Sequence, residues 1–101
     1  MWGIIEREEV ALIAKALSDA NRIRIIEMLV DGEKCGCEIL EELDISQPTL
    51  SHHMKILTEC NLLNSKKNGK WQIYSINSEK FKEFKLYIMR ISCDKCHIEV
   101  K

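Results

Sequence analysis

The chain has 101 residues, which is enough for one domain with a single modest core. Hydrophobic residues make up 46% of it, charged residues make up 31%, and the net charge is −1. This composition is that of a soluble globular protein with little nonspecific attraction for nucleic acid. No apolar run approaches the length of a membrane span, and the N-terminus lacks a signal-peptide pattern. An odd number of cysteines, five, then favours reduced thiols and a cytoplasmic location.

The first two predicted elements are helices. Residues Ile4–Leu17 carry an apolar stripe, with glutamates early in the segment. A second helix is predicted over Ala20–Val30, capped by Ser18 or Asp19, with Gly32 in the C′ position where glycine commonly ends a helix. The side chains expected to face the core are Ile5, Val10, Ile13, Leu17, Ile25, Ile26 and Leu29.

A helix-turn-helix is predicted next. A short helix over about Cys37–Leu43 precedes a turn at Asp44-Ile45. The following helix begins after Ser46, whose hydroxyl can accept a backbone N–H of the first turn, and Pro48 lies in that turn, where a missing N–H costs nothing. Its apolar stripe consists of Leu50, Met54 and Leu57.

The other face of this helix has the chemistry of a helix that enters a DNA major groove. Amide and hydroxyl groups can bond base edges, and a positive charge can bind phosphates. No carboxylate interrupts this face until Glu59. These residues taken alone also fit an ordinary solvated helix face. They are Ser46, Gln47, Thr49, Ser51, His52 and Lys55.

A predicted hairpin favours the DNA-binding interpretation. Asn68-Gly69 is the strongest two-residue hairpin signal, because a type I′ turn needs positive φ at both central positions. Lys66, Lys67 and Lys70 cluster around this turn, and Trp71–Ile76 supplies the return strand. A cationic hairpin directly after a polar-faced helix is the layout of a winged helix, whose wing lysines bind the flanking DNA backbone. Between Ser46 and Gln72 there are four lysines and one glutamate.

The last predicted helix covers Ser78–Ile91. Its apolar positions follow a heptad-like spacing at Phe81, Phe84, Ile88 and Ile91. Part of this stripe is expected to pack in the core. A homodimer joined through the first and last helices accounts for it better, because both helices are apolar and flank the DNA-reading unit. Two-fold symmetry would then place the two reading helices about one DNA turn apart.

Several short motifs occur together in the chain: Leu17-Ser18-Asp19-Ala20-Asn21-Arg22, Ser46-Gln47-Pro48, Ser51, His53, Leu57, Leu62-Leu63 and Gly69-Lys70-Trp71. In this combination they resemble the ArsR/SmtB family of metal-sensing bacterial and archaeal repressors, over about Ala16–Ile76. The resemblance implies a mainly α fold with a β-hairpin wing, dimeric through its terminal helices. We expect one winged helix-turn-helix domain over residues 1–101, with a short cysteine-containing C-terminal tail. The expected partner is double-stranded operator DNA, with no membrane and no cofactor needed for DNA binding.

The pair Cys35-Gly36-Cys37 lies between the second and third predicted helices. On a regular helix, residues i and i+2 point about 200° apart, so both thiols can bind one ion only if Gly36 lets the backbone depart from the helix. In the family that the motifs resemble, arsenic, cadmium and lead sensors carry a Cys-x-Cys here, and arsenic sensors add a third cysteine where this chain has Leu40. The resemblance therefore implies As(III) or Sb(III) as the first candidate inducers, and Cd(II) or Pb(II) as the second.

The C-terminal tail offers two further candidate ligands, Cys93 and Cys96. They could complete a site with the first cysteine pair across a dimer, or bind an ion separately. Cys60 matches a position that pairs with a tail cysteine in one branch of the family, but a small buried hydrophobe is the simpler interpretation. His97 is expected to be a solvated tail residue. Residues Lys80–Ile91 contain no Asp or His, so the family's zinc and nickel site is not expected.

The sequence therefore predicts a homodimeric transcriptional repressor that leaves its operator when a soft metal or metalloid binds cysteine thiolates. The alternative is a redox switch of the same fold, in which cysteine oxidation replaces metal binding. An enzyme is not predicted. The chain has no glycine-rich phosphate loop, no Ser/His/Asp arrangement and no plausibly placed carboxylate pair.

Overall fold

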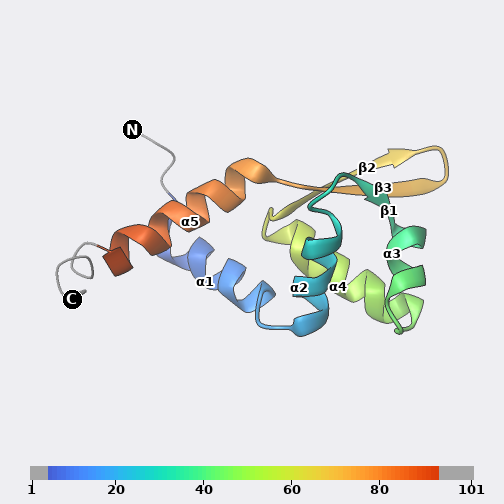
Figure 1. The fold of residues 1–101 in the computed structure, drawn as a ribbon, viewed down its shortest axis with the longest axis horizontal. Helices are drawn as coiled ribbons and strands as arrows, with labels where there is room; N and C mark the ends of the chain where they lie inside the picture. Colours follow the sequence, from blue (N-terminus) through green and yellow to red (C-terminus); the bar gives the residue numbers. More distant parts are fainter. Residues whose placement is uncertain (1–4, 94–101) are drawn as a thin grey trace.

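A computed structural model describes residues 5–93, and Figure 1 shows how its helices and strands are arranged. The wing hairpin and the end of α5 lie at opposite ends of the molecule, with α2 and α4 between them (Figure 1). Across the described residues, none of the helices is long and apolar enough to cross a membrane. The elements are α1 (Arg7–Ala16), α2 (Ala20–Met28), β1 (Lys34–Cys35), α3 (Gly36–Glu42), α4 (Gln47–Glu59), β2 (Leu63–Asn68), β3 (Trp71–Ile76) and α5 (Ser78–Cys93).

The boundaries of α2 show how local side chains set the helix ends. Asp19 caps the helix, because its carboxylate accepts the N–H groups of Asn21 (2.8 Å) and Arg22 (3.3 Å). The helix ends at Met28, two residues before the predicted end. Gly32 is therefore not at C′ but further along the turn, where its N–H donates to the carbonyl of Leu29 (3.2 Å). Its φ of +141° favours glycine at this position.

A third strand, β1, was not predicted. It pairs antiparallel with β3, with Lys34 opposite Tyr74 and Cys35 opposite Ile73, so that the sheet order is β1-β3-β2. Two residues are too few to show the alternation that identifies a strand in a sequence. The pairing places the cysteine segment directly against the return strand of the wing.

The wing turn differs by one residue from the prediction. Asn68 pairs with Trp71, so the two central residues of the turn are Gly69 and Lys70 rather than Asn68 and Gly69. Gly69 has a φ of +69°, whereas Asn68 and Lys70 do not have positive φ. A positive φ at only the first central position matches a type II′ turn with glycine there, not a type I′ turn. The hairpin itself is confirmed.

The core forms where α1, α2, α3 and α4 meet. The predicted stripe of α4 is buried, with Leu50, Met54 and Leu57 each at most 5% exposed. The largest fully buried side chains are Ile13, Ile25, Ile39, Leu57 and Leu62. The core is thus built around α4, which leaves the opposite face of that helix free.

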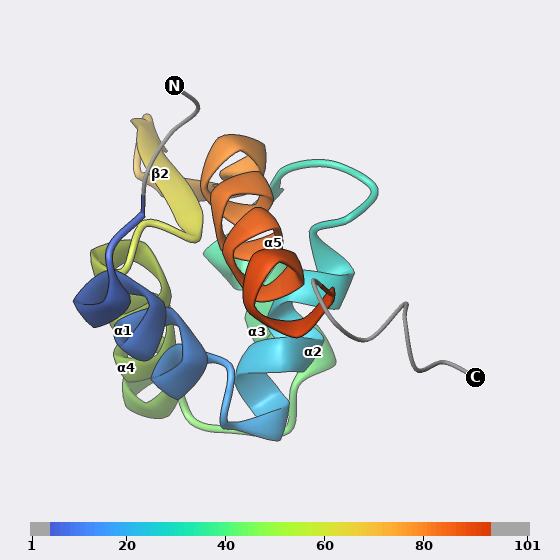
Figure 2. The ribbon, with the colours of Figure 1, turned by 90° about the vertical axis from the view of Figure 1, so that its left-hand side faces the viewer.

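Helix α5 lies on the same side of the molecule as α1 (Figures 1 and 2). The ammonium of Lys80 contacts Glu9 of α1 (2.7 Å) and Glu83 (3.1 Å), and these carboxylates, Glu9 first, raise the pKa of Lys80. Phe81, Phe84 and Tyr87 pack partly against the core. Further along α5, Ile88, Met89 and Ile91 remain exposed, at 38%, 44% and 64%.

Candidate functional site

The start of α4 is fixed by the two hydroxyl residues that were predicted to contact DNA. The Ser46 hydroxyl accepts the backbone N–H of Thr49 (3.3 Å) and donates to the Thr49 hydroxyl (2.9 Å). Ser46 is therefore an N-cap, as predicted, and Pro48 lies in the first turn. Both hydroxyls are exposed but already hydrogen-bonded to each other. Their visible role is to fix where the helix begins.

The rest of the polar face of α4 is exposed. Gln47, Ser51, His52 and Lys55 all lie at the surface. Lys55 is 4.0 Å from Glu59 one turn later, and both side chains are about two-thirds exposed, so this ion pair is weak. The lysine remains available to a stronger anion such as a phosphate. The face therefore has the donors, acceptors and positive charge that groove recognition needs.

The wing presents its three lysines in different directions. Lys66 and Lys67 are neighbours in β2, so their side chains lie on opposite faces of the ribbon. Lys66 is 3.4 Å from Glu33, whereas Lys70 lies over the ring of Trp71 at 5.5 Å from its centroid. Trp71 is 48% exposed beside these lysines. The sequence had indicated Trp71 as part of the return strand and of the Gly69-Lys70-Trp71 motif, but not as a DNA contact, although an aromatic residue beside a cationic turn is a signal that could have marked it.

A buried polar contact joins α2 to α4. Arg22 and His53 are 9% and 6% exposed, and a guanidinium nitrogen of Arg22 lies 3.1 Å from Nδ1 of His53. Because a guanidinium can only donate hydrogen bonds, Nδ1 must be the acceptor. The Nε atom of Arg22 also donates to the carbonyl of Ala16 (2.7 Å), at the end of α1. The two bonds of Arg22 join the end of α1, α2 and α4 behind the exposed polar face of α4, and the sequence alone did not reveal them.

Replacing His53 should destabilise the protein far more than replacing its neighbour. We expect His53→Leu to lower the free energy of unfolding by about 2–3 kcal/mol, because it leaves a buried charged donor of Arg22 without its acceptor. His52→Leu is the matched control on the exposed face and should change stability by less than about 0.5 kcal/mol. Urea unfolding at one fixed protein concentration measures both. Equal effects of the two changes would show that the Arg22 contact contributes nothing.

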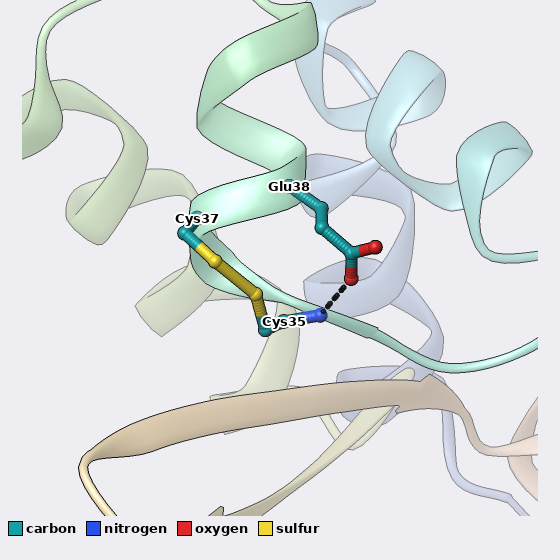
Figure 3. The surroundings of a disulfide bond; sticks show 3 residues. All are labelled: Cys35, Cys37 and Glu38. Carbon is teal, nitrogen blue, oxygen red and sulfur yellow. Dashed lines mark hydrogen bonds between the residues drawn. A yellow bond between two sulfur atoms is a disulfide. The ribbon is translucent and has the colours of Figure 1, made fainter.

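Cys35 and Cys37 meet at the start of α3, where their sulfur atoms form a disulfide (Figure 3). Their Cα atoms are 5.4 Å apart. The two residues do not lie together on a regular helix, because Cys35 is the N-cap of α3 and has extended backbone angles, φ −84° and ψ 159°. The position of Cys35 just outside the helix therefore brings the two sulfurs together.

Gly36 is not what permits this geometry. It is the first residue of α3 and has no positive φ, and a methyl group there would lie in ordinary contact with the ring of Tyr74 (3.5 Å). The backbone N–H of Cys35 donates to the carboxylate of Glu38 (2.9 Å), which gives Glu38 a capping role beyond simple solvation (Figure 3). The disulfide also differs from the expectation of reduced thiols, since the structure joins this pair.

The structure describes the other three cysteines to different extents. Cys60 is 7% exposed, and its thiol donates to the carbonyl of Leu57 (3.5 Å). Burial raises the pKa of Cys60, which disfavours the thiolate that a soft ion requires and agrees with a packing role. Cys93 is the last residue of α5, but its side chain lies outside the described part, as do Cys96 and His97 altogether. Among the side chains that the structure describes, no group of three Cys, His, Asp or Glu could hold a metal ion.

A helix-turn-helix whose second helix has an exposed polar face, followed by a lysine-bearing hairpin, defines a winged helix-turn-helix fold. The family model described as "Bacterial regulatory protein, arsR family" matches residues 19–65. The chain belongs to the ArsR family, and it is a transcriptional repressor rather than an enzyme.

Three similar proteins illustrate this membership. The arsenical resistance operon repressor of Staphylococcus xylosus is 46% identical over 72 residues, which cover 71% of this chain and 69% of the relative. A cadmium resistance transcriptional regulatory protein CadC homolog of Staphylococcus aureus is 36% identical over 76 residues, covering 74% of this chain and 63% of the relative. The solved structure of an ArsR-like transcriptional regulator from Rhodococcus sp. RHA1 has a TM-score of 0.78 at 24% identity, covering 86% and 82% of the two chains. This structure supports the fold.

Proposed function

We propose that this repressor leaves its operator when a soft metal or metalloid binds the thiolates of Cys35 and Cys37. The observation that carries the proposal is the meeting of these two sulfurs at the start of α3. Two sulfurs close enough to bond each other can, once reduced, bind one ion together. Thiolates select soft ions, and the names of the relatives refer to arsenical and cadmium resistance. As(III) and Sb(III) are therefore the first candidates, and Cd(II) and Pb(II) the second.

The location of the pair offers a route from ion binding to DNA release. Cys35 ends β1, which pairs with β3 of the wing, and Cys37 lies in the first turn of α3, the helix that precedes α4. An ion that changes the sulfur positions acts on both DNA-contacting elements. A coupling free energy of about 1–3 kcal/mol is typical of such regulation. Cys93 and Cys96 remain candidates for further ligands, from the same subunit or from a partner.

The proposed DNA contacts divide into two groups. Gln47, Ser51 and His52 would face base edges in the major groove, with Lys55 and the capped hydroxyls of Ser46 and Thr49 at the edge of that surface. Lys66, Lys67 and Lys70 would bind the backbone beside it. This division is supported by the exposure of all these side chains around one end of the molecule.

A homodimer would present this surface twice. The support is apolar surface on the two terminal helices: Leu12 of α1 is 57% exposed, and Ile88, Met89 and Ile91 of α5 are also exposed. A cavity of about 590 Å³ along α5 is lined by Phe81, Phe84 and Ile88 among others. Exposed apolar side chains gathered along one helix, as on α5, are typical of an interaction surface.

The disulfide supports a second function, a repressor controlled by thiol oxidation. The same two cysteines would then switch between dithiol and disulfide instead of binding an ion. The two functions differ in what releases operator from fully reduced protein: arsenite in the first case, and an oxidant in the second.

Substitutions in the two groups of proposed DNA contacts should change DNA affinity in different ways. Gln47→Ala should reduce the preference for operator over random DNA, because it removes a base-reading amide. Lys67→Ala should weaken binding to all sequences alike and lower the salt dependence by about one unit of the log–log slope. Fluorescence anisotropy over a range of salt concentrations measures both. Unchanged binding by both variants would contradict the assigned surface.

A further inference from the structure

Trp71 lies beside the turn of the wing and is 48% exposed. It is the first residue of β3, pairs with Asn68 and directly follows the turn at Gly69 and Lys70. A single exposed apolar residue is ordinary in proteins, so exposure alone assigns no role to it. Its surroundings do, because they are cationic and adjoin the exposed face of α4.

Two lysines accompany the indole ring. The ammonium of Lys70 lies 5.5 Å from the ring centroid. Lys66 is opposite Ile73, two residues after Trp71, so strand pairing and alternation put Lys66 and Trp71 on the same face of the hairpin. Lys66 also lies 3.4 Å from Glu33, in an exposed ion pair that a phosphate can replace. The ring is therefore the apolar part of a cationic surface.

The same ring belongs to a concave surface that the wing shares with α4. A cavity of about 510 Å³ lies between β3, α3 and the start of α4. Trp71 and Lys70 line it from the wing, and Gln47 and Ser51 line it from α4. The last two are proposed base-reading residues. A DNA duplex that reaches them therefore also passes beside Trp71.

We propose that Trp71 packs its indole ring against a deoxyribose of the operator backbone, next to a phosphate bound by Lys70. This inference rests on the proposed DNA-binding surface and adds an apolar contact to it. Each internal phosphate of a DNA strand is bonded to two sugars, so a cation and an aromatic ring that contact each other match the order of groups along the backbone. Burial of the ring on a sugar adds affinity that does not depend on released counterions. Because sugars are the same at every base pair, the contact strengthens binding without selecting sequence.

The fluorescence of Trp71 tests whether the ring contacts DNA. In full-length, fully reduced protein, Trp2→Phe leaves Trp71 as the only tryptophan. The probe is a duplex that the protein selects from random-sequence DNA. Saturating duplex should shift the emission to shorter wavelength and lower quenching by acrylamide about twofold or more, because the exposed part of the ring becomes covered. Unchanged emission and quenching, while anisotropy shows duplex binding, would overturn this inference and leave the proposed function standing. Absence of duplex binding would overturn the proposed function.

Substitutions separate an apolar contact from an ionic one. Trp71→Ala should weaken binding to selected and unselected duplexes alike, by about tenfold, and leave the salt slope unchanged. Lys70→Ala should instead lower that slope by about one unit. Trp71→Phe keeps a flat apolar ring and should hold affinity within about threefold of the original. The matched control, Ile23→Ala, removes an apolar side chain of α2 that is 41% exposed and should leave affinity unchanged.

Three results would overturn the proposed contact, provided that circular dichroism shows folded variants. A lower salt slope for Trp71→Ala would mean that the ring only positions Lys70. A DNA bend that disappears with Trp71→Ala, measured by energy transfer between the duplex ends, would mean that the ring is a wedge between base pairs. Tighter binding to a single strand than to the duplex would mean that the ring stacks on unpaired bases.

Discussion

Serine at both Cys35 and Cys37 should abolish release by arsenite, antimonite or cadmium and leave operator affinity within about twofold. The change removes both soft donors, so the ion loses its site. Serine is close in size to cysteine and is a favourable N-cap, so α3 should still begin at the same residue. Release is measured by anisotropy of labelled operator with fully reduced protein.

Two controls identify which thiols matter. Cys60→Ala removes a buried thiol and should leave the response intact. Cys93→Ser with Cys96→Ser should weaken the response if the tail contributes ligands, and leave it unchanged if the first pair is sufficient. Loss of response with the tail variant alone, and a normal response without Cys35 and Cys37, would refute the assigned site.

Glutamate at both Phe84 and Ile88 should split the proposed dimer. Each subunit would have to bury unpaired carboxylates against the apolar surface of α5, a cost that the interface could not offset. Operator affinity should then fall on the order of 100-fold, because two linked half-site contacts become independent. Sedimentation velocity measures the assembly, and circular dichroism checks that the monomer remains folded.

The matched control places the same charges elsewhere. Ile23 and Val30 are apolar residues in and just after α2, exposed at 41% and 68%. Ile23→Glu with Val30→Glu should leave the sedimentation coefficient unchanged. A dimer that survives the α5 substitutions would place the interface on another surface.

The elements that the sequence predicted well are those with strong local signals. The N-cap Ser46, Pro48 in the first turn and the stripe at Leu50, Met54 and Leu57 placed α4 correctly, because capping and 3.6-residue periodicity act within a few residues. The hairpin was predicted from Asn68-Gly69 and the flanking strands, although the centre of the turn lies one residue further along, at Gly69 and Lys70. Local signals therefore predict the presence of an element more reliably than they predict its first and last residues.

The features that the sequence did not reveal depend on contacts between distant residues. Arg22 and His53 are 31 positions apart, and only the packing of α2 on α4 brings them together. The strand β1 exists because β3 offers it a free edge, not because its two residues favour extended structure. A cavity of about 510 Å³ lined by Cys37, Gln47 and Tyr74 among others likewise combines residues of α3, α4 and the wing, which no single segment contains.

The pairing of β1 with β3 has a consequence for how operator release depends on the amount of inducer. Within one subunit, β1 pairs antiparallel with β3 of the wing, and Cys35 lies opposite Ile73. Under the proposed function, an ion bound by one subunit therefore acts on that subunit's own wing and does not depend on a signal across the dimer. Each half of a dimer on DNA would loosen independently, and the first ion bound would already weaken one of the two linked half-site contacts, so release would begin before both subunits are occupied.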